Sequence, residues 1–104
     1  MTLKKLILTG AFSWIATGIA HADTLIHISD FKFSPDSVQT SAGSTVTWIN
    51  DDAAHHSLSS NDGLFDSQLL NHGESFSYTF KQPGIYSYHC GVHKYMTGTI
   101  VVKQ

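Results

Sequence analysis

The sequence predicts an all-β protein, a Greek-key sandwich or small barrel of about seven to eight strands. Three observations predict this class. Apolar and aromatic residues alternate with polar ones in several short segments, the pattern of half-buried strands. Gly, Pro, Asn and Asp separate these segments and mark turns. Apolar residues show no helical periodicity that extends beyond a single turn.

In the first half of the domain, the alternation predicts strands over residues 25–29, 37–41 and 44–50. Ile26 and Ile28 share one face of the first strand, and Trp48 lies on the apolar face of the third. Residues 31–36 are expected to form a turn, because Pro35 fixes its own φ angle.

In the second half, strands are predicted over residues 56–60, 75–80, 85–90 and 97–102, with loops over 51–54 and 61–73. Phe76, Tyr78 and Phe80 share a face of their strand. On the strand that ends at residue 90, Tyr88 and Cys90 share the face expected to point into the core.

The first 22 residues have the form of a secretory signal peptide. Lys4 and Lys5 precede a mostly apolar run over 6–20, and Ala20-His21-Ala22 has the small-x-small form of a cleavage site. The run is short for a spanning helix, which needs about 20 apolar residues. We therefore expect 1–22 to be cleaved and 23–104 to be one soluble periplasmic domain without membrane insertion.

The composition narrows the function classes. The whole chain has a formal net charge of −2, and loss of Lys4 and Lys5 makes the remaining domain more negative. A basic surface for nucleic acid is therefore not expected. Cys90 is the only cysteine, so an internal disulfide is excluded. A bound metal is therefore expected to stabilise this small domain. We expect the domain to be a monomer.

Cys90, His93 and Met96 form a Cys-x2-His-x2-Met row near the end of the chain, and Met96 is the only methionine besides Met1. Two histidines and a cysteine with a weak axial methionine are the ligand set of a blue-copper electron-transfer site. The row lacks one histidine, which must come from elsewhere. The candidates are His27, His55, His56, His72 and His89.

Several segments resemble the cupredoxins, the type 1 blue-copper proteins, and the amicyanins among them. They are residues 31–35, 46–58, 83–88 and 98–102, together with the short loop between Cys90 and Met96. In that family the upstream ligand lies six residues after the Asn of a Val-Thr-Trp-x-Asn strand. Because Asn50 ends such a strand here, the resemblance selects His56.

The resemblance implies a single type 1 copper ion bound by His56, Cys90, His93 and Met96. It implies a carrier that passes one electron between protein redox partners, an amine dehydrogenase and a c-type cytochrome in the amicyanin case. It also implies that electrons leave through His93. No open coordination position is expected, so the protein is not expected to be an enzyme.

Three residues depart from the family pattern. His55 and Lys94 stand where proline is frequent, and Ser57 stands where asparagine usually links the two ligand segments. The serine hydroxyl is shorter than that amide and is expected to make only part of the link. Because hydrogen bonds around the ligands tune a metal site, we expect a shifted reduction potential.

Other interpretations remain open at this stage. The protein could handle copper as a chaperone instead of carrying electrons, or Cys90 could be a catalytic nucleophile beside a histidine. Met96 could instead fill space in the core. A structural zinc site is a further alternative, but zinc has little use for a methionine ligand. Asp51, Asp52 and Asp62 are interpreted as solvated loop residues, because a calcium site needs more oxygen ligands at regular spacing.

Overall fold

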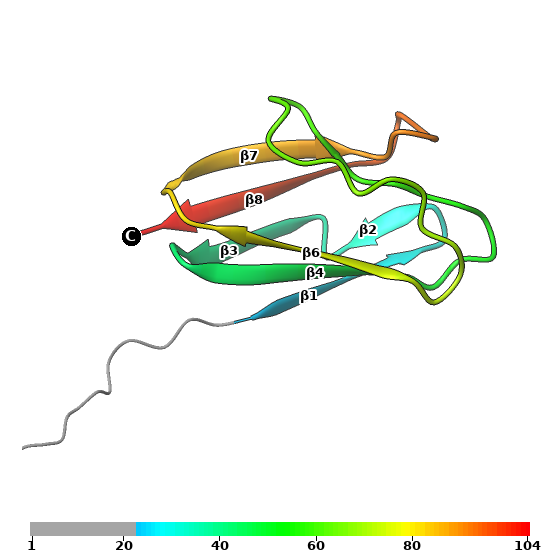
Figure 1. Cartoon of the computed structure of the whole chain (residues 1–104), viewed down its shortest axis with the longest axis horizontal. Coiled ribbons are helices and arrows are strands. Elements are labelled where there is room, and N and C mark those ends of the chain that lie inside the picture. The colour runs from blue at the N-terminus through cyan, green and yellow to red at the C-terminus, as the bar shows by residue number, and fades with distance from the viewer. Residues whose placement is uncertain (1–22) are drawn as a thin grey trace, which may run out of the picture.

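The computed structural model describes residues 23–104, so the predicted signal peptide lies outside the described residues. The described part folds into two facing β-sheets (Figure 1). The strands are β1 (Thr24–Ser29), β2 (Lys32–Ser34), β3 (Ser37–Ser41), β4 (Ser44–Asn50), β5 (Ser59–Ser60), β6 (Ser75–Phe80), β7 (Gly84–His89) and β8 (Thr97–Lys103). Within this range no helix has the length and apolar character that crossing a bilayer requires.

The two sheets have four strands each, in the orders β2-β1-β4-β6 and β3-β8-β7-β5. Strand β1 runs parallel to β4, and β3 runs parallel to β8, while the other neighbours are antiparallel. The chain passes from one sheet to the other after β2, β3, β4, β5 and β6. This is a β-sandwich, and the all-β prediction is confirmed.

The core lies between the sheets and follows from the period-two alternation. Ile26, Trp48, Phe80, Tyr88 and Ile100 are each no more than 1% exposed. Burying a large apolar side chain stabilises a fold by about 1.5–3 kcal/mol. The rings of Trp48 and Tyr88 meet edge to face across the sandwich, with centroids 5.3 Å apart. The residues expected to face inward therefore hold the two sheets together.

The strands predicted over 25–29, 85–90 and 97–102 are shifted or extended by one residue, so that Cys90 follows β7 instead of ending it. Two further predicted elements differ more from the structure. Residues 31–36, expected to be a turn, contain β2, and the turn lies earlier, at Asp30 and Phe31 between the paired Ser29 and Lys32. The strand expected over 56–60 is reduced to β5, because His56 makes only an isolated bridge with Leu70. Both differences lie beside the residues that form the site.

Candidate metal centre

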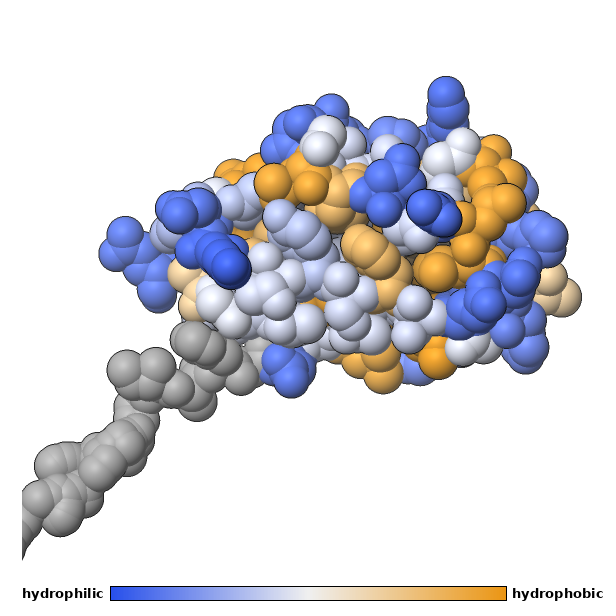
Figure 2. Space-filling model, in the orientation of Figure 1, coloured by the Kyte–Doolittle hydropathy of each residue, from blue (hydrophilic) through white to orange (hydrophobic). Residues whose placement is uncertain are grey.

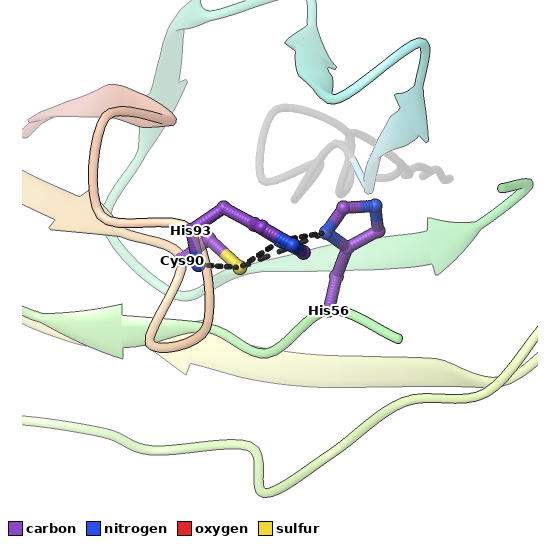
Figure 3. Close-up of side chains that lie close together, drawn as sticks. All are labelled: His56, Cys90 and His93. Atoms are coloured by element: carbon purple, nitrogen blue, oxygen red, sulfur yellow. Dashed lines mark hydrogen bonds between the residues drawn. The ribbon is translucent and has the colours of Figure 1, made fainter. Parts of the chain in front are cut away.

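Cys90, His56 and His93 meet at one end of the sandwich. The Cys90 sulfur lies 3.7 Å from His56 Nδ1 and 4.0 Å from His93 Nδ1, and the two Nδ1 atoms are 3.3 Å apart. Cys90 and His56 are fully buried, and His93 is half-buried. Figure 3 shows Cys90 and His93 reaching from the segment after β7 toward His56, which comes from the segment between β4 and β5.

The size of this triangle fits one metal ion. A point equidistant from the three donor atoms lies about 2.1 Å from each, and protein ligands bind such ions at about 2.0–2.1 Å through nitrogen and about 2.3 Å through sulfur. A thiolate with two imidazoles suits copper. The donors therefore fit a metal in both chemistry and spacing.

The segment from Cys90 to Met96 closes on itself through two backbone hydrogen bonds. The Cys90 N–H donates to the Met96 carbonyl at 3.0 Å, and the Met96 N–H donates to the His93 carbonyl at 3.0 Å. Met96 is 3% exposed, so its side chain is buried beside the cluster's own loop. The structure thus brings the predicted row into a single compact loop.

Backbone N–H groups point at the Cys90 sulfur from both ligand segments. Ser57 N–H lies 3.4 Å from Sγ, and His93 N–H lies 3.5 Å from it. A hydrogen bond to a charged sulfur stabilises that charge, so these N–H groups are placed to support a metal-bound sulfur. The thiolate is the form of cysteine that binds a metal.

Ser57 also joins the two ligand segments through its side chain. Its hydroxyl accepts a hydrogen bond from the Gly91 N–H at 3.0 Å. A Cβ atom at position 91 would lie 2.6 Å from that hydroxyl oxygen, closer than real Cβ contacts allow. The short hydroxyl therefore makes the link, and the missing side chain of Gly91 makes room for it.

Asp52 fixes the other side of the His56 ring. Its Oδ2 lies 2.9 Å from His56 Nε2, and the same carboxylate accepts from the backbone N–H groups of Asp30 at 2.8 Å and Phe31 at 2.9 Å. An ionised carboxylate only accepts, so Nε2 carries the proton and Nδ1 offers a lone pair toward Cys90. Burial raises the pKa of Asp52, but these hydrogen bonds outweigh it and hold the pKa below 3.8.

The interpretation of Asp52 as a solvated loop residue was therefore wrong. The available signal was a carboxylate four residues before the selected histidine, because metal-binding histidines commonly donate their second ring N–H to a carboxylate. That signal was not decisive. Asp51 has the same chemistry one position earlier, and its carboxylate pairs with His27 instead.

The other four candidate histidines lie outside the cluster. His27 pairs with the exposed Asp51 at 2.6 Å, and His55 lies in an exposed loop. The His72 ring contacts the Asp52 carbonyl at 3.2 Å, and the His89 ring contacts the Asn61 side-chain oxygen at 2.7 Å. Of the candidates for the upstream position, the structure brings only His56 to Cys90 and His93.

The half-buried His93 ring lies against Phe31 and Tyr95, and Val92 precedes it in the chain. Val92 is 47% exposed, Tyr95 is 71% exposed and Phe31 is 38% exposed. In the space-filling view, apolar residues gather at the end of the molecule where the segment after β7 lies (Figure 2). Lys94 lies exposed between Val92 and Tyr95 in the sequence and adds a positive charge there.

Comparisons with known proteins match this chain to cupredoxins, including amicyanins. The family model described as a cupredoxin-like domain matches residues 5–102. Amicyanin-alpha from Methylorubrum extorquens is 33% identical over 85 residues, covering 77% of this chain and 71% of that protein. A solved purple cupredoxin from Nitrosopumilus maritimus is 32% identical with a TM-score of 0.71, over 77% of this chain and 99% of that one. The Cu(I) form of an amicyanin methionine-to-alanine variant is 30% identical with a TM-score of 0.75, over 83% and 87%.

Proposed function

Since the chain belongs to the cupredoxin family, with copper as its cofactor, we propose that it is a soluble periplasmic carrier of single electrons between protein partners. When bound, copper supplies a one-electron Cu(II)/Cu(I) couple. The observation that carries the proposal is the triangle of buried His56, buried Cys90 and half-buried His93, whose donor atoms are spaced for one ion. Met96, which is 3% exposed, would complete the proposed ligand set with its thioether sulfur.

The protein surrounding this triangle favours electron transfer over catalysis. Cys90 is 0% exposed, so a substrate cannot reach its sulfur unless the ligand segments move apart. Both the His56 imidazole and the sulfur are held by hydrogen bonds from separate segments, which resists rearrangement when the charge of the site changes. A site that rearranges little exchanges electrons readily.

His93 is the proposed exit for electrons. Its ring is half-buried and lies among exposed apolar side chains, so a partner that covers this end comes close to the site. By likeness to amicyanins, the partners would be an amine dehydrogenase as donor and a c-type cytochrome as acceptor. Lys94 would favour a partner with an acidic rim, because complementary charge speeds encounter.

The decisive experiment loads the 23–104 domain with Cu(II) and records its visible and EPR spectra. We expect an intense thiolate-to-copper band that disappears in Cys90→Ser and His56→Ala. The matched control is His55→Ala, an adjacent exposed histidine, which should keep the band. A colourless oxidised protein, or an unchanged band in Cys90→Ser, would overturn the proposal. A pale complex that passes copper quickly to another chelator would identify a copper-handling protein instead.

A further inference from the structure

In the turn between β1 and β2, the bulky Phe31 has a positive φ angle, a conformation that such residues rarely adopt. Asp30 and Phe31 have φ angles of 55° and 57°, and they form the two-residue loop between the paired Ser29 and Lys32. Two-residue hairpins of this kind favour Asn-Gly or Asp-Gly, because both positions need a positive φ. A bulky residue at such a φ is a genuine outlier, and a retained outlier points to a function for its side chain.

The Phe31 ring lies against both imidazoles of the site. Its centroid is 5.0 Å from the His56 ring at an interplanar angle of 84°, and 5.0 Å from the His93 ring at 74°. The two imidazoles are themselves 5.0 Å apart. Phe31 therefore contacts both imidazole rings from its place in the turn.

The Asp52 carboxylate ties this turn to the site. Its two oxygens accept the N–H groups of both strained residues, Oδ1 from Asp30 and Oδ2 from Phe31, and Oδ2 also faces His56 Nε2. The Asp52 carboxylate thus binds both the turn that carries Phe31 and the His56 ring, which Phe31 contacts. An amide could not replace it, because only one of its two terminal atoms accepts.

We propose that Phe31 and Asp52 are positioning residues that hold His56 and His93 in their ligand arrangement before copper binds, and so slow copper loss. The inference rests on the proposed function only in taking these histidines as ligands. It adds a role for a strained surface turn that belongs to the opposite sheet from Cys90. Groups that orient metal ligands typically change metal affinity by about 10–100-fold when removed.

The test compares Phe31→Gly and Asp52→Asn with the wild-type domain. Glycine accepts the positive φ and removes the ring, whereas asparagine keeps the size of Asp52 and removes one acceptor. We expect each variant to release Cu(I) to excess bathocuproine disulfonate about tenfold faster or more. In the copper-free protein, NMR relaxation should show increased motion of the His93 ring. Phe31→Tyr, which keeps the ring, should behave as wild type in both measurements.

The matched control is Asp51→Asn, the same substitution at the neighbouring carboxylate, which pairs with the exposed His27. It should leave copper release unchanged. Wild-type release rates and ring motion in Phe31→Gly would overturn the inference and leave Phe31 as a surface residue only. A wild-type domain that binds no copper in coloured form would overturn the proposed function instead, so the two failures are distinguishable.

Discussion

At the scale of single residues, Ser57 has the clearest measurable consequence. Its hydroxyl accepts from the Gly91 N–H, while its own N–H points at the Cys90 sulfur. We expect Ser57→Ala to lower the free energy of unfolding of the copper-free domain by about 1 kcal/mol, the usual net value of one hydrogen bond. Urea unfolding measures this. Ser77→Ala is the control, since it breaks an exposed hydrogen bond to Thr47 and should cost less.

The same variant should lower the reduction potential of the copper-loaded protein. N–H groups near the sulfur stabilise the electron-richer reduced site, and loss of the link to Gly91 loosens the segment that presents them. An energy of about 0.5–1.5 kcal/mol corresponds to roughly 20–60 mV for one electron. A redox titration tests this, with Ser57→Asn as the variant that restores the family residue. If both variants keep the wild-type potential, Ser57 has no tuning role.

Single residues also show where sequence reasoning stops. The Cys90, His93 and Met96 row was visible in the sequence, because all three lie in one short loop. The choice of His56 over His55 depended on the family resemblance, since adjacent histidines have the same chemistry. Asp52 was missed, because its three hydrogen bonds depend on the fold that brings β1, β2 and the segment after β4 together.

At the scale of elements, strands with clean alternation were predicted well. Strands β3, β4 and β6 have the predicted bounds, since each alternates between core and solvent along its whole length. Strand β2 was missed because it has only three residues, too few for a period of two to be recognised. The segment at 56–60 was overestimated, because His56 makes only an isolated bridge with Leu70 and regular strand pairing is limited to Ser59 and Ser60.

Contact between β7 and β8 depends on a glycine. A Cβ atom at Gly98 would lie 2.3 Å from Cζ and the hydroxyl oxygen of Tyr88, whose ring is 1% exposed and packs in the core. We expect Gly98→Ala to destabilise the domain by about 1–3 kcal/mol, the usual cost of overpacking. Urea unfolding at neutral pH gives the value.

The control for this prediction is Gly63→Ala. Gly63 has a φ of +79°, but a Cβ atom added there would meet nothing within 4 Å, so the substitution adds only backbone strain. That strain costs about 1 kcal/mol. A Gly98→Ala protein as stable as wild type would mean that the Tyr88 ring moves aside without cost.

At the scale of the whole molecule, the site depends on both sheets. Cys90 follows β7 of one sheet, whereas Asp52 follows β4 and Phe31 follows β1 of the other. The sandwich core holds these sheets in a fixed relation, so any condition that weakens the core also loosens the site. Tyr88 is a core residue whose ionisation links the stability of the fold to pH.

Burial raises the pKa of Tyr88 from 10.0 to about 12. The folded protein therefore keeps this proton up to about pH 12, while the unfolded chain releases it at about pH 10. The resulting stability is fully present below about pH 10 and is lost as the pH rises toward 12, by about 2–3 kcal/mol in all.

Urea unfolding of the copper-free domain between about pH 9 and 12 should show this loss. The loss should be smaller in Tyr88→Phe and unchanged in Tyr95→Phe, which alters a tyrosine that is 71% exposed. Equal losses in wild type and Tyr88→Phe would show that the alkaline limit of the fold is set by other groups.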